Sequence, residues 1–445
     1  MKVHFLGIGG SGASATAALS QAQGYEVTGC DLEPHNKFTT VFNKEQLQTE
    51  HSPQHLRFHP KGAGSIDILA VTPAIFSLDP NNPELLAAKE KDIPILTWQQ
   101  FAGEYLTKDK FVIAVCGTHG KTTTTAMIAQ ILEDAGLDPA VEVGAIVPRW
   151  GTNFRIPQQK VHDREYFVIE ADEFNDNFLH FKPDITVVTN IEMDHPEYFK
   201  DLEAVKESFK EFLFQTKNTI IANFSDPVVN QILSIHPKGV NTIIDYSKHL
   251  KSESSQASLI DFTLHIPGEF NIINASAAFQ VGLILSIDPQ IIRQSLEGYT
   301  GVSRRFEYIG EYKEAKVYSD FGHHPTEIKV TMEAARQKFP NERILLVYQP
   351  HMFSRTKILF DDFVKVFKEV PVDKTFIMDI FPSRELNTNL VTSQQLVDAV
   401  GRDTVTYIGS TNKVLEKLKP EIRKGDILFF MSAGDTDKLA RELSS

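Results

Sequence analysis

The chain has 445 residues and a formal net charge of −13, with 45 Lys and Arg against 58 Asp and Glu. Its 42% hydrophobic and 23% charged residues are near the averages of globular proteins, which excludes a disordered or fibrous chain. The apolar runs are too short to cross a bilayer, the first residues lack the features of a signal peptide, and two cysteines fit a reducing compartment. We therefore expect a soluble, cytoplasmic protein of about three domains, and the acidic balance argues against binding to nucleic acids or membranes.

Strand-like runs alternate with helical patterns along the chain, which predicts an α/β protein with parallel sheets. In the first domain, expected at residues 1–106, the strands are Val3–Ile8, Ile66–Val71 and Ile93–Leu96, and the helices are Gly12–Ala22, Pro83–Lys91 and Trp98–Leu106. The polar segment Thr107–Lys110 is expected to be a linker.

The central domain is expected at residues 107–302 and the third at 303–445. Central elements are the strands Phe111–Cys116, Tyr166–Glu170 and Ile185–Thr189, the helices Thr122–Ala135, Leu202–Phe214, Ile272–Leu285 and Pro289–Leu296, and an exposed loop at Lys248–Gln256. The third domain interleaves helices with the strands Lys316–Ser319, Ile344–Tyr348, Thr375–Met378 and Ile427–Met431.

A glycine-containing turn, Gly117-Thr118-His119-Gly120-Lys121-Thr122-Thr123, lies between a buried-type strand and a helix. In such a turn the backbone N–H groups cradle phosphate oxygens, the lysine reaches the β- and γ-phosphates, and the threonine binds Mg²⁺. The full P-loop pattern requires a glycine where this chain has Val115, so only the shorter form GTxGKT is present. We expect ATP to bind here; the alternative is a strand–turn–helix that contains a lysine by chance.

Two polar clusters follow later strands of the central domain, at the sheet edge where ligands gather. Glu170–Glu173 closes one strand and Thr189–His195 closes the next. Carboxylate and imidazole groups are credible ligands for Mg²⁺ held among phosphates. Glu170 and His195 are therefore candidate metal ligands, and the alternatives are a solvated acidic loop and a surface histidine.

A second glycine-rich turn, Gly7-Ile8-Gly9-Gly10-Ser11-Gly12, has the GxGxxG pattern, and Asp31 follows nineteen residues later. The pattern indicates a phosphate-bearing ligand at a helix N-terminus and does not identify its base. The ligand is either a nucleotide-linked substrate or a redox cofactor, and the alternative is a turn used for close packing.

Two further clusters lie in the second half of the chain. Asn271 and Asn274 are three residues apart at the start of a helix, where they can contact a purine or ribose or cap the helix. Asp320, His323 and His324 follow a strand and offer an acid and two histidines at a sheet edge. Adjacent histidines do not easily face one metal ion, which disfavours zinc there.

These motifs resemble those of the bacterial Mur ligases over essentially the whole chain, most closely the alanine-adding branch. The matching segments are GIGGSG at Gly7–Gly12, GTHGKTTTT at Gly117–Thr125, EADE at Glu170–Glu173, TNIEMDH at Thr189–His195, NIINASAA at Asn271–Ala278, SRRFE at Ser303–Glu307, DFGHHPTEI at Asp320–Ile328, QPHMFSRT at Gln349–Thr356 and SAGD at Ser432–Asp435.

The resemblance implies a Rossmann-like first domain for the UDP part of the substrate, a central P-loop domain for ATP, and a Rossmann-like third domain for the amino acid. The implied activity joins L-alanine to the carboxylate of UDP-N-acetylmuramate through an acyl phosphate, using ATP and Mg²⁺, in peptidoglycan precursor synthesis. The enzyme would act as a monomer or weak homodimer.

The resemblance also implies the following residue roles. The UDP-bearing substrate would be bound by Gly9, Gly10, Ser11, Gly12, Asp31 and Thr72. ATP would be bound by Gly117, Thr118, His119, Gly120, Lys121, Thr122, Thr123, Asn271, Asn274, Arg305 and Asp320. Thr122, Glu170 and His195 would serve magnesium, and His323, His351 and Arg355 would line the amino-acid side. The catalytic set would be Lys121, Glu170, His195, Arg305 and His323.

The chain departs from the usual family pattern at three aromatic positions. Phe174 replaces a serine, Phe270 replaces a histidine and Phe321 replaces a tyrosine. Some Mur ligases carry a carbamylated lysine after the metal-binding histidine; here Lys210 is about one residue out of register, and the alanine-adding branch also lacks that lysine.

Three other functions are weighed against this one. The first is a recycling ligase that attaches the tripeptide L-Ala-γ-D-Glu-meso-diaminopimelate to UDP-N-acetylmuramate. The second is an NAD-dependent oxidoreductase, which only Gly7–Gly12 and Asp31 favour. The third is a non-catalytic nucleotide-binding protein, which the presence of Lys121 and Glu170 disfavours.

Overall fold

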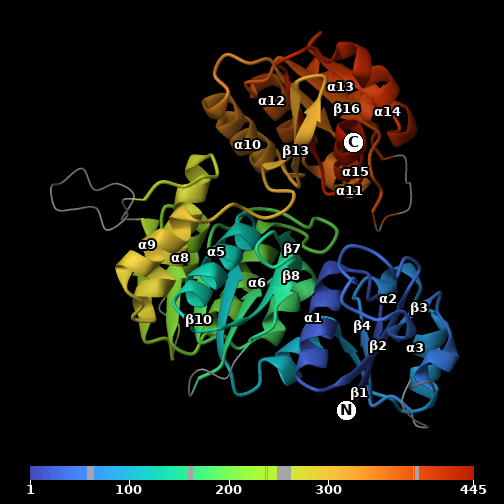
Figure 1. The fold of residues 1–445 in the computed structure, drawn as a ribbon, viewed down its shortest axis with the longest axis vertical. Coiled ribbons are helices and arrows are strands. Elements are labelled where there is room, and N and C mark those ends of the chain that lie inside the picture. The colour runs from blue at the N-terminus through green and yellow to red at the C-terminus, as the bar shows by residue number, and fades with distance from the viewer. Residues whose placement is uncertain are drawn as a thin grey trace. The chain divides into compact units, whose positions relative to one another are not determined.

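The computed structural model describes residues 1–57, 65–158, 164–235, 237, 239–247, 262–383, 385 and 390–445, so the loop expected at Lys248–Gln256 lies outside the described residues. The chain forms two compact units. The first unit comprises Met1–Glu192, Val205–Phe262 and Asn274–Glu297, and the second comprises Met193–Ala204, Thr263–Ile273 and Gly298–Ser445. Two sheets belong to the first unit and a third sheet belongs to the second (Figure 1).

The N-terminal sheet of the first unit is entirely parallel, with the order β3-β2-β1-β4-β5. Its strands are β1 (Lys2–Leu6), β2 (Glu26–Asp31), β3 (Leu47–Thr49), β4 (Ile68–Val71) and β5 (Ile95–Thr97). A parallel sheet needs a cover on both faces, and Phe5 packs edge-on against Phe101 of α4 (Trp98–Phe101) on one of them.

The opposite face of this sheet carries Leu6 and Cys30, which pack with Leu56 and Leu85. Leu56 ends the short helix η2 (Pro53–Leu56), and Leu85 belongs to α3 (Pro83–Glu90). The segment predicted as one helix over Trp98–Leu106 is instead α4 followed by a π-helical turn at Ala102–Leu106.

The central sheet of the first unit has the order β12-β11-β10-β6-β9-β7-β8 and is parallel except for the β7–β8 pair. Its strands are β6 (Phe111–Cys116), β7 (Ala140–Val147), β8 (Thr152–Arg155), β9 (Tyr166–Glu170), β10 (Ile185–Val188), β11 (Thr219–Ala222) and β12 (Thr242–Asp245). Its helices are α5 (Lys121–Asp134), α6 (Leu202–Phe214), α7 (Pro227–Leu233), α8 (Glu269–Ile284) and α9 (Pro289–Glu297). The strand β6 lies between β9 and β10, so three strand ends meet beside the turn that follows Cys116.

The helix α1 (Ser11–Ala22) joins the two sheets of the first unit, because it packs against β7 and β8 as well as β2. The contact contains two buried polar side chains: the Thr16 hydroxyl donates to Glu142 Oε2 at 3.2 Å. Asn153 on β8 donates from its amide nitrogen to the carbonyl oxygen of Ser11 at 2.7 Å. These bonds fix the start of α1 against the central sheet.

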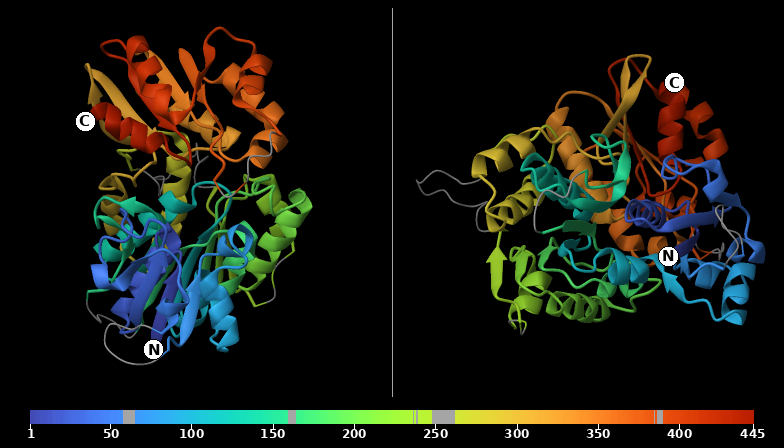
Figure 2. Two further views of the ribbon diagram at one scale, coloured as in Figure 1. Left: turned by 90° about the vertical axis from the view of Figure 1, so that its right-hand side faces the viewer. Right: turned by 60° about the horizontal axis from the view of Figure 1, so that its bottom comes forward.

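The second unit contains a sheet of order β13-β14-β18-β15-β16-β17, parallel except for the β13–β14 hairpin at its edge, which can be followed in Figure 2. The strands are β13 (Glu307–Tyr312), β14 (Ala315–Asp320), β15 (Ile344–Tyr348), β16 (Lys374–Met378), β17 (Val405–Gly409) and β18 (Ile427–Met431). One face is covered by α10 (Pro325–Lys338), α12 (Phe360–Glu369) and α13 (Ser393–Val400), and the other by α14 (Thr411–Leu418) and α15 (Thr436–Ser444) (Figure 1).

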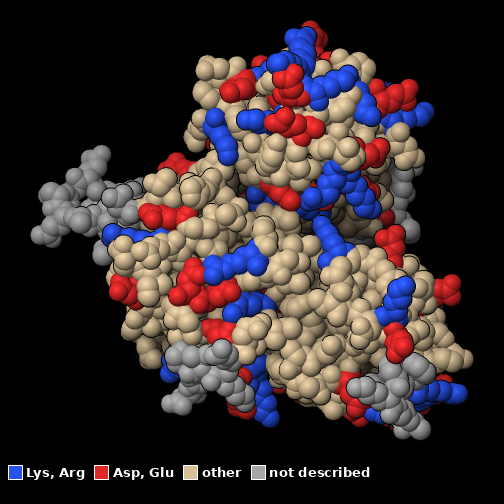
Figure 3. All heavy atoms as spheres, in the orientation of Figure 1, with Lys and Arg blue, Asp and Glu red and all other residues tan. Residues whose placement is uncertain are grey.

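Acidic and basic side chains are interspersed over the face drawn in Figure 3, without one continuous basic field. Within the described residues, every helix is too short or too polar to cross a bilayer.

Candidate active site

The turn after β6 requires glycine at two positions. Gly117 and Gly120 have φ values of 130° and 85°, in the left-handed region that side chains rarely adopt. A Cβ at Gly120 would lie 2.5 Å from the amide oxygen of Asn274, and one at Gly117 would overlap the Thr189 hydroxyl. The backbone between them can therefore curve tightly into the N-terminus of α5, where free N–H groups favour an anion.

Lys121 places its ammonium group inside this turn. Its Nζ donates to the carbonyl oxygens of Gly117 at 2.6 Å and Thr118 at 3.2 Å, and lies 2.9 Å from Glu173 Oε2. Burial lowers the pKa of Lys121, but the carboxylates of Glu173 and Asp172 more than offset this and raise it above its ordinary value. Lys121 therefore stays protonated, with Glu173 as its partner in this structure, and its ammonium group is of the kind that binds phosphate oxygens.

Thr122 and Glu170 meet at the same sheet edge. The Thr122 hydroxyl donates to Glu170 Oε1 at 2.8 Å, and the other carboxylate oxygen accepts from the Gly144 N–H at 2.6 Å. The adjacent strands explain the meeting, because Glu170 pairs in register with Val115 of β6. A hydroxyl and a carboxylate are oxygen donors of the kind that Mg²⁺ takes, so these residues fit the expected ion.

The loop after β10 holds the turn in place. The side-chain amide of Asn190 binds His119 twice: its oxygen accepts from the His119 N–H at 2.9 Å, and its nitrogen donates to the His119 carbonyl oxygen at 3.0 Å. The backbone carbonyl oxygen of Asn190 accepts from the Thr118 N–H. The Thr189 hydroxyl donates to the same His119 carbonyl at 2.7 Å, and Glu192 pairs with the His119 ring. The sequence pattern predicts metal ligands in this loop and does not indicate that Thr189 and Asn190 position the turn.

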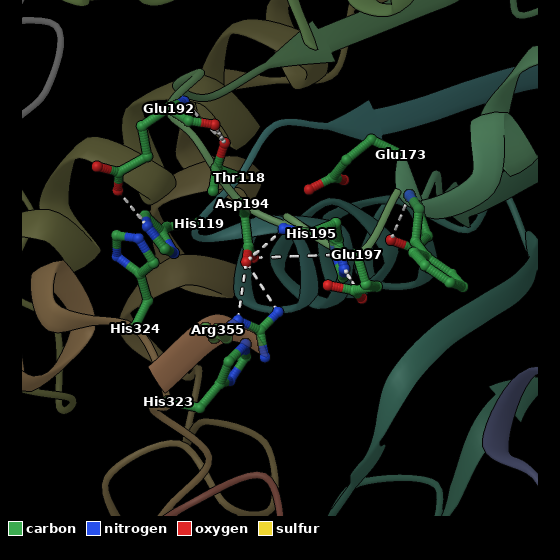
Figure 4. A network of polar contacts seen from close by, with 12 residues as sticks. Thr118, His119, Glu173, Glu192, Asp194, His195, Glu197, His323, His324 and Arg355 are labelled. Atoms are coloured by element: carbon green, nitrogen blue, oxygen red, sulfur yellow. Dashed lines mark hydrogen bonds and ion pairs between the residues drawn. The ribbon is translucent and has the colours of Figure 1, made fainter. Parts of the chain in front are cut away.

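In the second unit, Asp194 and Arg355 form a buried ion pair, shown in Figure 4. Asp194 Oδ1 accepts from Arg355 Nη2 at 2.8 Å and Nε at 3.1 Å, and also from the His195 N–H at 2.7 Å. Burial raises the pKa of Asp194, but His195 and Arg355 outweigh it and hold the pKa well below its usual range. The sequence pattern does not indicate that Asp194 is the partner of this arginine.

The three residues expected on the amino-acid side lie together in the second unit. Arg355 Nη1 is 3.2 Å from His351 Nδ1, and the rings of His351 and His323 are 5.8 Å apart. Two of the guanidinium nitrogens of Arg355 are used by Asp194, so Nη1 is the one directed toward the histidines. Burial lowers the pKa of His323 to about 4, which leaves its imidazole neutral at neutral pH.

Asp320 and Arg305 are arranged around the N-terminus of α10. Asp320 accepts from the Phe306 N–H at 2.9 Å and the Gly322 N–H at 2.8 Å, which fixes the loop after β14. Arg305 Nη1 lies 3.5 Å from Glu327, and Glu327 also accepts from the His323 N–H. Glu327 therefore links an arginine and a histidine of the predicted catalytic set.

The two asparagines of the NIINASAA segment both lie near the start of α8, which crosses the boundary between the two units. Asn271 belongs to the second unit and donates to the Pro267 carbonyl oxygen at 2.6 Å, as a residue near the start of α8. Asn274 belongs to the first unit and lies against Gly120. His195 belongs to the second unit, and Thr122 and Glu170 to the first.

The GxGxxG turn gathers the residues expected to bind the UDP part of a substrate. Asp31, at the end of β2, accepts from the Gly9 N–H at 2.9 Å, and Asn36 donates to the Gly9 carbonyl oxygen at 3.0 Å. Gly7 has a φ of 86°, and a Cβ there would lie 2.5 Å from the methyl group of Thr72. The structure thus brings Asp31 and Thr72 to this turn, together with Asn36, which the sequence analysis did not name.

The structure shows the surroundings of two positions at which the chain departs from the family pattern, Phe321 and Lys210. The Phe321 ring lies under the guanidinium groups of Arg304 and Arg305, whose Cζ atoms are 4.8 and 5.2 Å from its centroid. Lys210 on α6 pairs with Glu207 one turn away at 3.3 Å, whereas the neighbouring Ser208 is buried and donates to Asp176.

The class of protein follows from the chain's similarity to known protein families. Three family models match in chain order: the Mur ligase family catalytic domain at residues 2–110, the Mur ligase middle domain at 115–282, and the Mur ligase glutamate ligase domain at 304–434. The chain belongs to the Mur ligase family, whose members are ATP-dependent, ADP-forming amide ligases.

Its relatives include proteins named UDP-N-acetylmuramate–L-alanine ligase. The one from Aquifex aeolicus is 34% identical over 458 residues, covering 99% of this chain and 96% of the relative. The one from Desulfitobacterium hafniense is 35% identical over 462 residues, covering 100% and 99%.

Solved structures establish the same fold. The UDP-N-acetylmuramate-alanine ligase of Thermotoga maritima superposes with a TM-score of 0.76 at 24% identity, covering 100% of this chain and 98% of that one. A murein peptide ligase from Psychrobacter arcticus gives a TM-score of 0.70 at 23% identity, with the same coverage. The predicted three-part α/β architecture and the predicted family are confirmed.

Proposed function

We propose that this protein joins L-alanine to the carboxylate of UDP-N-acetylmuramate, with conversion of ATP to ADP and phosphate, in the synthesis of peptidoglycan precursors. The observation that carries the proposal is the turn at Gly117–Thr122, where a partly buried lysine and a hydroxyl–carboxylate pair occupy one sheet edge. Relatives at 34–35% identity over nearly the whole chain bear the name of this activity.

The first chemical step is an in-line attack of the substrate carboxylate on the γ-phosphorus, which forms an acyl phosphate and releases ADP. Such a transfer depends mainly on positioning and on neutralisation of negative charge. Lys121 and the N–H groups at the start of α5 are proposed to hold the β- and γ-phosphates, and Arg305 the γ-phosphate. Mg²⁺, bound by Thr122 and Glu170 with His195 as a further candidate, would supply Lewis-acid neutralisation of phosphate charge.

The second step is attack of the alanine amine on the activated carbonyl carbon, which forms the amide bond and expels phosphate. The amine must be unprotonated, and a neutral His323 can accept a hydrogen bond from it. His351 and the Nη1 of Arg355 are proposed to bind the carboxylate of the amino acid, since a guanidinium offers directed donors. Gly9–Gly12, Asp31 and Thr72 are proposed to hold the UDP part.

The proposal is tested by supplying UDP-N-acetylmuramate, ATP and Mg²⁺ with equal concentrations of L-alanine and the tripeptide L-Ala-γ-D-Glu-meso-diaminopimelate. We expect phosphate release and a product with the mass of the alanine adduct. Because one methylene contributes only about 1–3 kcal/mol to discrimination, glycine and L-serine should be weaker but detectable acceptors. A predominant tripeptide adduct would show the recycling activity instead, and absence of phosphate release with either acceptor would refute a ligase.

The nucleotide preference of the first domain is tested separately by calorimetry. UDP-N-acetylmuramate should bind without ATP, because the GxGxxG turn is proposed to take its diphosphate. Binding of NAD, with no binding of the UDP-sugar, would reverse the assignment.

A further inference from the structure

A cluster of potential metal ligands lies in the N-terminal part of the first unit, and none of its members belongs to the candidate active site. Its members are His4 on β1, Cys30 at the end of β2, His55 in η2 and Glu84 near the start of α3. His4, Cys30 and Glu84 are buried, with exposed fractions of 1%, 0% and 0%. One ligand atom from each of the four residues lies within 4.8 Å of all the others.

The strand register explains how these residues meet. His4 pairs with Thr28 and Leu6 pairs with Cys30 in the parallel β1–β2 ladder. Since side chains two apart share a face of a strand, His4 and Cys30 point to the same side of the sheet. Glu84 enters this side from α3, whose N-terminal end favours a carboxylate.

The distances around Glu84 suit a shared cation. Glu84 Oε2 is 3.2 Å from His4 Nε2, and Oε1 is 2.8 Å from His55 Nδ1 and 3.1 Å from Cys30 Sγ. In a tetrahedral zinc site, with metal bonds of about 2.0–2.3 Å, ligand atoms are roughly 3.3–3.8 Å apart. The contacts to Glu84 are shorter than this spacing, while the other ligand atoms lie within 4.8 Å of one another. Side-chain movements of about 1 Å or less would therefore bring the four residues to the spacing of a tetrahedral zinc site.

Two atoms of the cluster lack a hydrogen-bond partner among the described residues. These are His4 Nε2 and Glu84 Oε2, which face each other without hydrogen-bond geometry. The other nitrogen of His4 is in contact with the Thr28 hydroxyl at 2.8 Å, which fixes the ring so that Nε2 points into the cluster. A metal-bound histidine typically has its second nitrogen held in this way.

We propose that His4, Cys30, His55 and Glu84 form a structural zinc site. The mixed nitrogen, sulfur and oxygen donors suit Zn²⁺ and disfavour Mg²⁺, which takes oxygen ligands. Binding would release the thiol proton of Cys30 to solvent, and the thiolate and the Glu84 carboxylate would neutralise the two charges of the ion. The site would then bury no net charge, while linking β1, β2, η2 and α3.

A cavity of about 350 Å³ gives access to the cluster. It is lined by His4, Thr28, Glu45, Gln48, Gln54 and His55. His55 is 14% exposed, the most exposed of the four proposed ligands. The ion could therefore reach the site in the folded protein.

The test measures zinc affinity on the full chain after removal of metals with a chelator. Excess Mg²⁺ is present throughout, so that it occupies the oxygen ligands near Thr122 and Glu170. Zinc bound there then does not contribute to the measured affinity. We expect one equivalent of Zn²⁺ per chain, and an affinity at least about 100-fold lower in Cys30→Ser and in His55→Gln. His35→Gln, which changes an exposed histidine of the same region, should bind like the unaltered protein.

Cobalt gives a second readout that does not depend on stability. Co²⁺ bound through a thiolate shows a sulfur-to-metal charge-transfer band, which should vanish in Cys30→Ser and remain in Cys116→Ser. Because His55 is partly exposed, His55→Gln is expected to fold even where Cys30→Ser does not. Failure of the unaltered protein to retain zinc, or equal zinc affinity in His55→Gln, would overturn the proposal. Both results are independent of the ligase activity.

Discussion

The carboxyl group of Glu142 is expected to make the first unit less stable as the pH rises from about 5 to about 8. Glu142 is 3% exposed on β7, and the Thr16 hydroxyl donates to it. Burial raises the pKa of Glu142 from 4.5 to about 8 in the folded protein. The unfolded chain would release this proton near the ordinary value.

The sign and size of the effect follow from proton linkage. Between the two pKa values the folded state holds a proton that the unfolded state has lost, so the free energy of unfolding falls with rising pH. Each pKa unit corresponds to about 1.4 kcal/mol. The ordinary pKa of this carboxyl is 4.5, and its pKa in the folded protein is about 8. Glu142 should therefore lower the free energy of unfolding by roughly 3 kcal/mol at pH 7, and this loss should level off above pH 8.

Glu142→Gln tests this reasoning, because glutamine resembles the protonated acid at every pH. The two tryptophans, Trp98 and Trp150, both belong to the first unit, so their fluorescence follows its unfolding in urea. We expect the stability difference in favour of the variant to grow by roughly 3 kcal/mol between pH 5.5 and 8. The exposed Glu90→Gln is the control. Parallel pH profiles for the unaltered protein and Glu142→Gln would refute the argument.

Three further predictions concern the candidate site. Lys121→Ala should lower turnover roughly 10²–10³-fold in a phosphate-release assay, because it removes one strong electrostatic contact; turnover within a factor of three of the unaltered protein would contradict the P-loop assignment. Asp194→Asn should destabilise the second unit by about 3–5 kcal/mol in urea unfolding, since Arg355 remains buried without its counter-charge, and adding Arg355→Met should recover part of this loss. Gly117→Ala should weaken ATP binding in calorimetry through overlap with a neighbouring hydroxyl. Gly136→Ala, at a glycine that also has a positive φ but has open space around it, should leave ATP binding unchanged.

The elements that could be predicted from the sequence are those with long apolar runs. The strands Phe111–Cys116, Tyr166–Glu170, Ile344–Tyr348 and Ile427–Met431 have the predicted bounds, because each is buried on both faces and bordered by polar residues. Short or edge strands such as β3, β8 and β13 were not predicted. Their residues alternate little or lie partly exposed, so their pairing depends on neighbours that are distant in the sequence.

The candidate site likewise has parts that can be predicted from the sequence and parts that cannot. The turn at Gly117–Thr122 was predictable because glycine and lysine at fixed spacing follow a buried strand. The pairing of Asp194 with Arg355 was not, since 161 residues separate the two and each has other plausible roles. The role of Asn190 was also hidden, because an asparagine after a strand gives no sign of which backbone it will bond.

The second unit is built from separate segments of the chain, and this limits how the chain can be shortened. Its sheet comes from Gly298–Ser445, yet Asp194 reaches it from the separate segment Met193–Ala204. A fragment that begins near residue 303 would keep Arg355 in the interior and lose the carboxylate that neutralises it, at a cost comparable with the whole stability of many small domains. A shortened form of the second unit therefore has to include the segment Met193–Ala204, although the family model for this part of the chain begins only at residue 304.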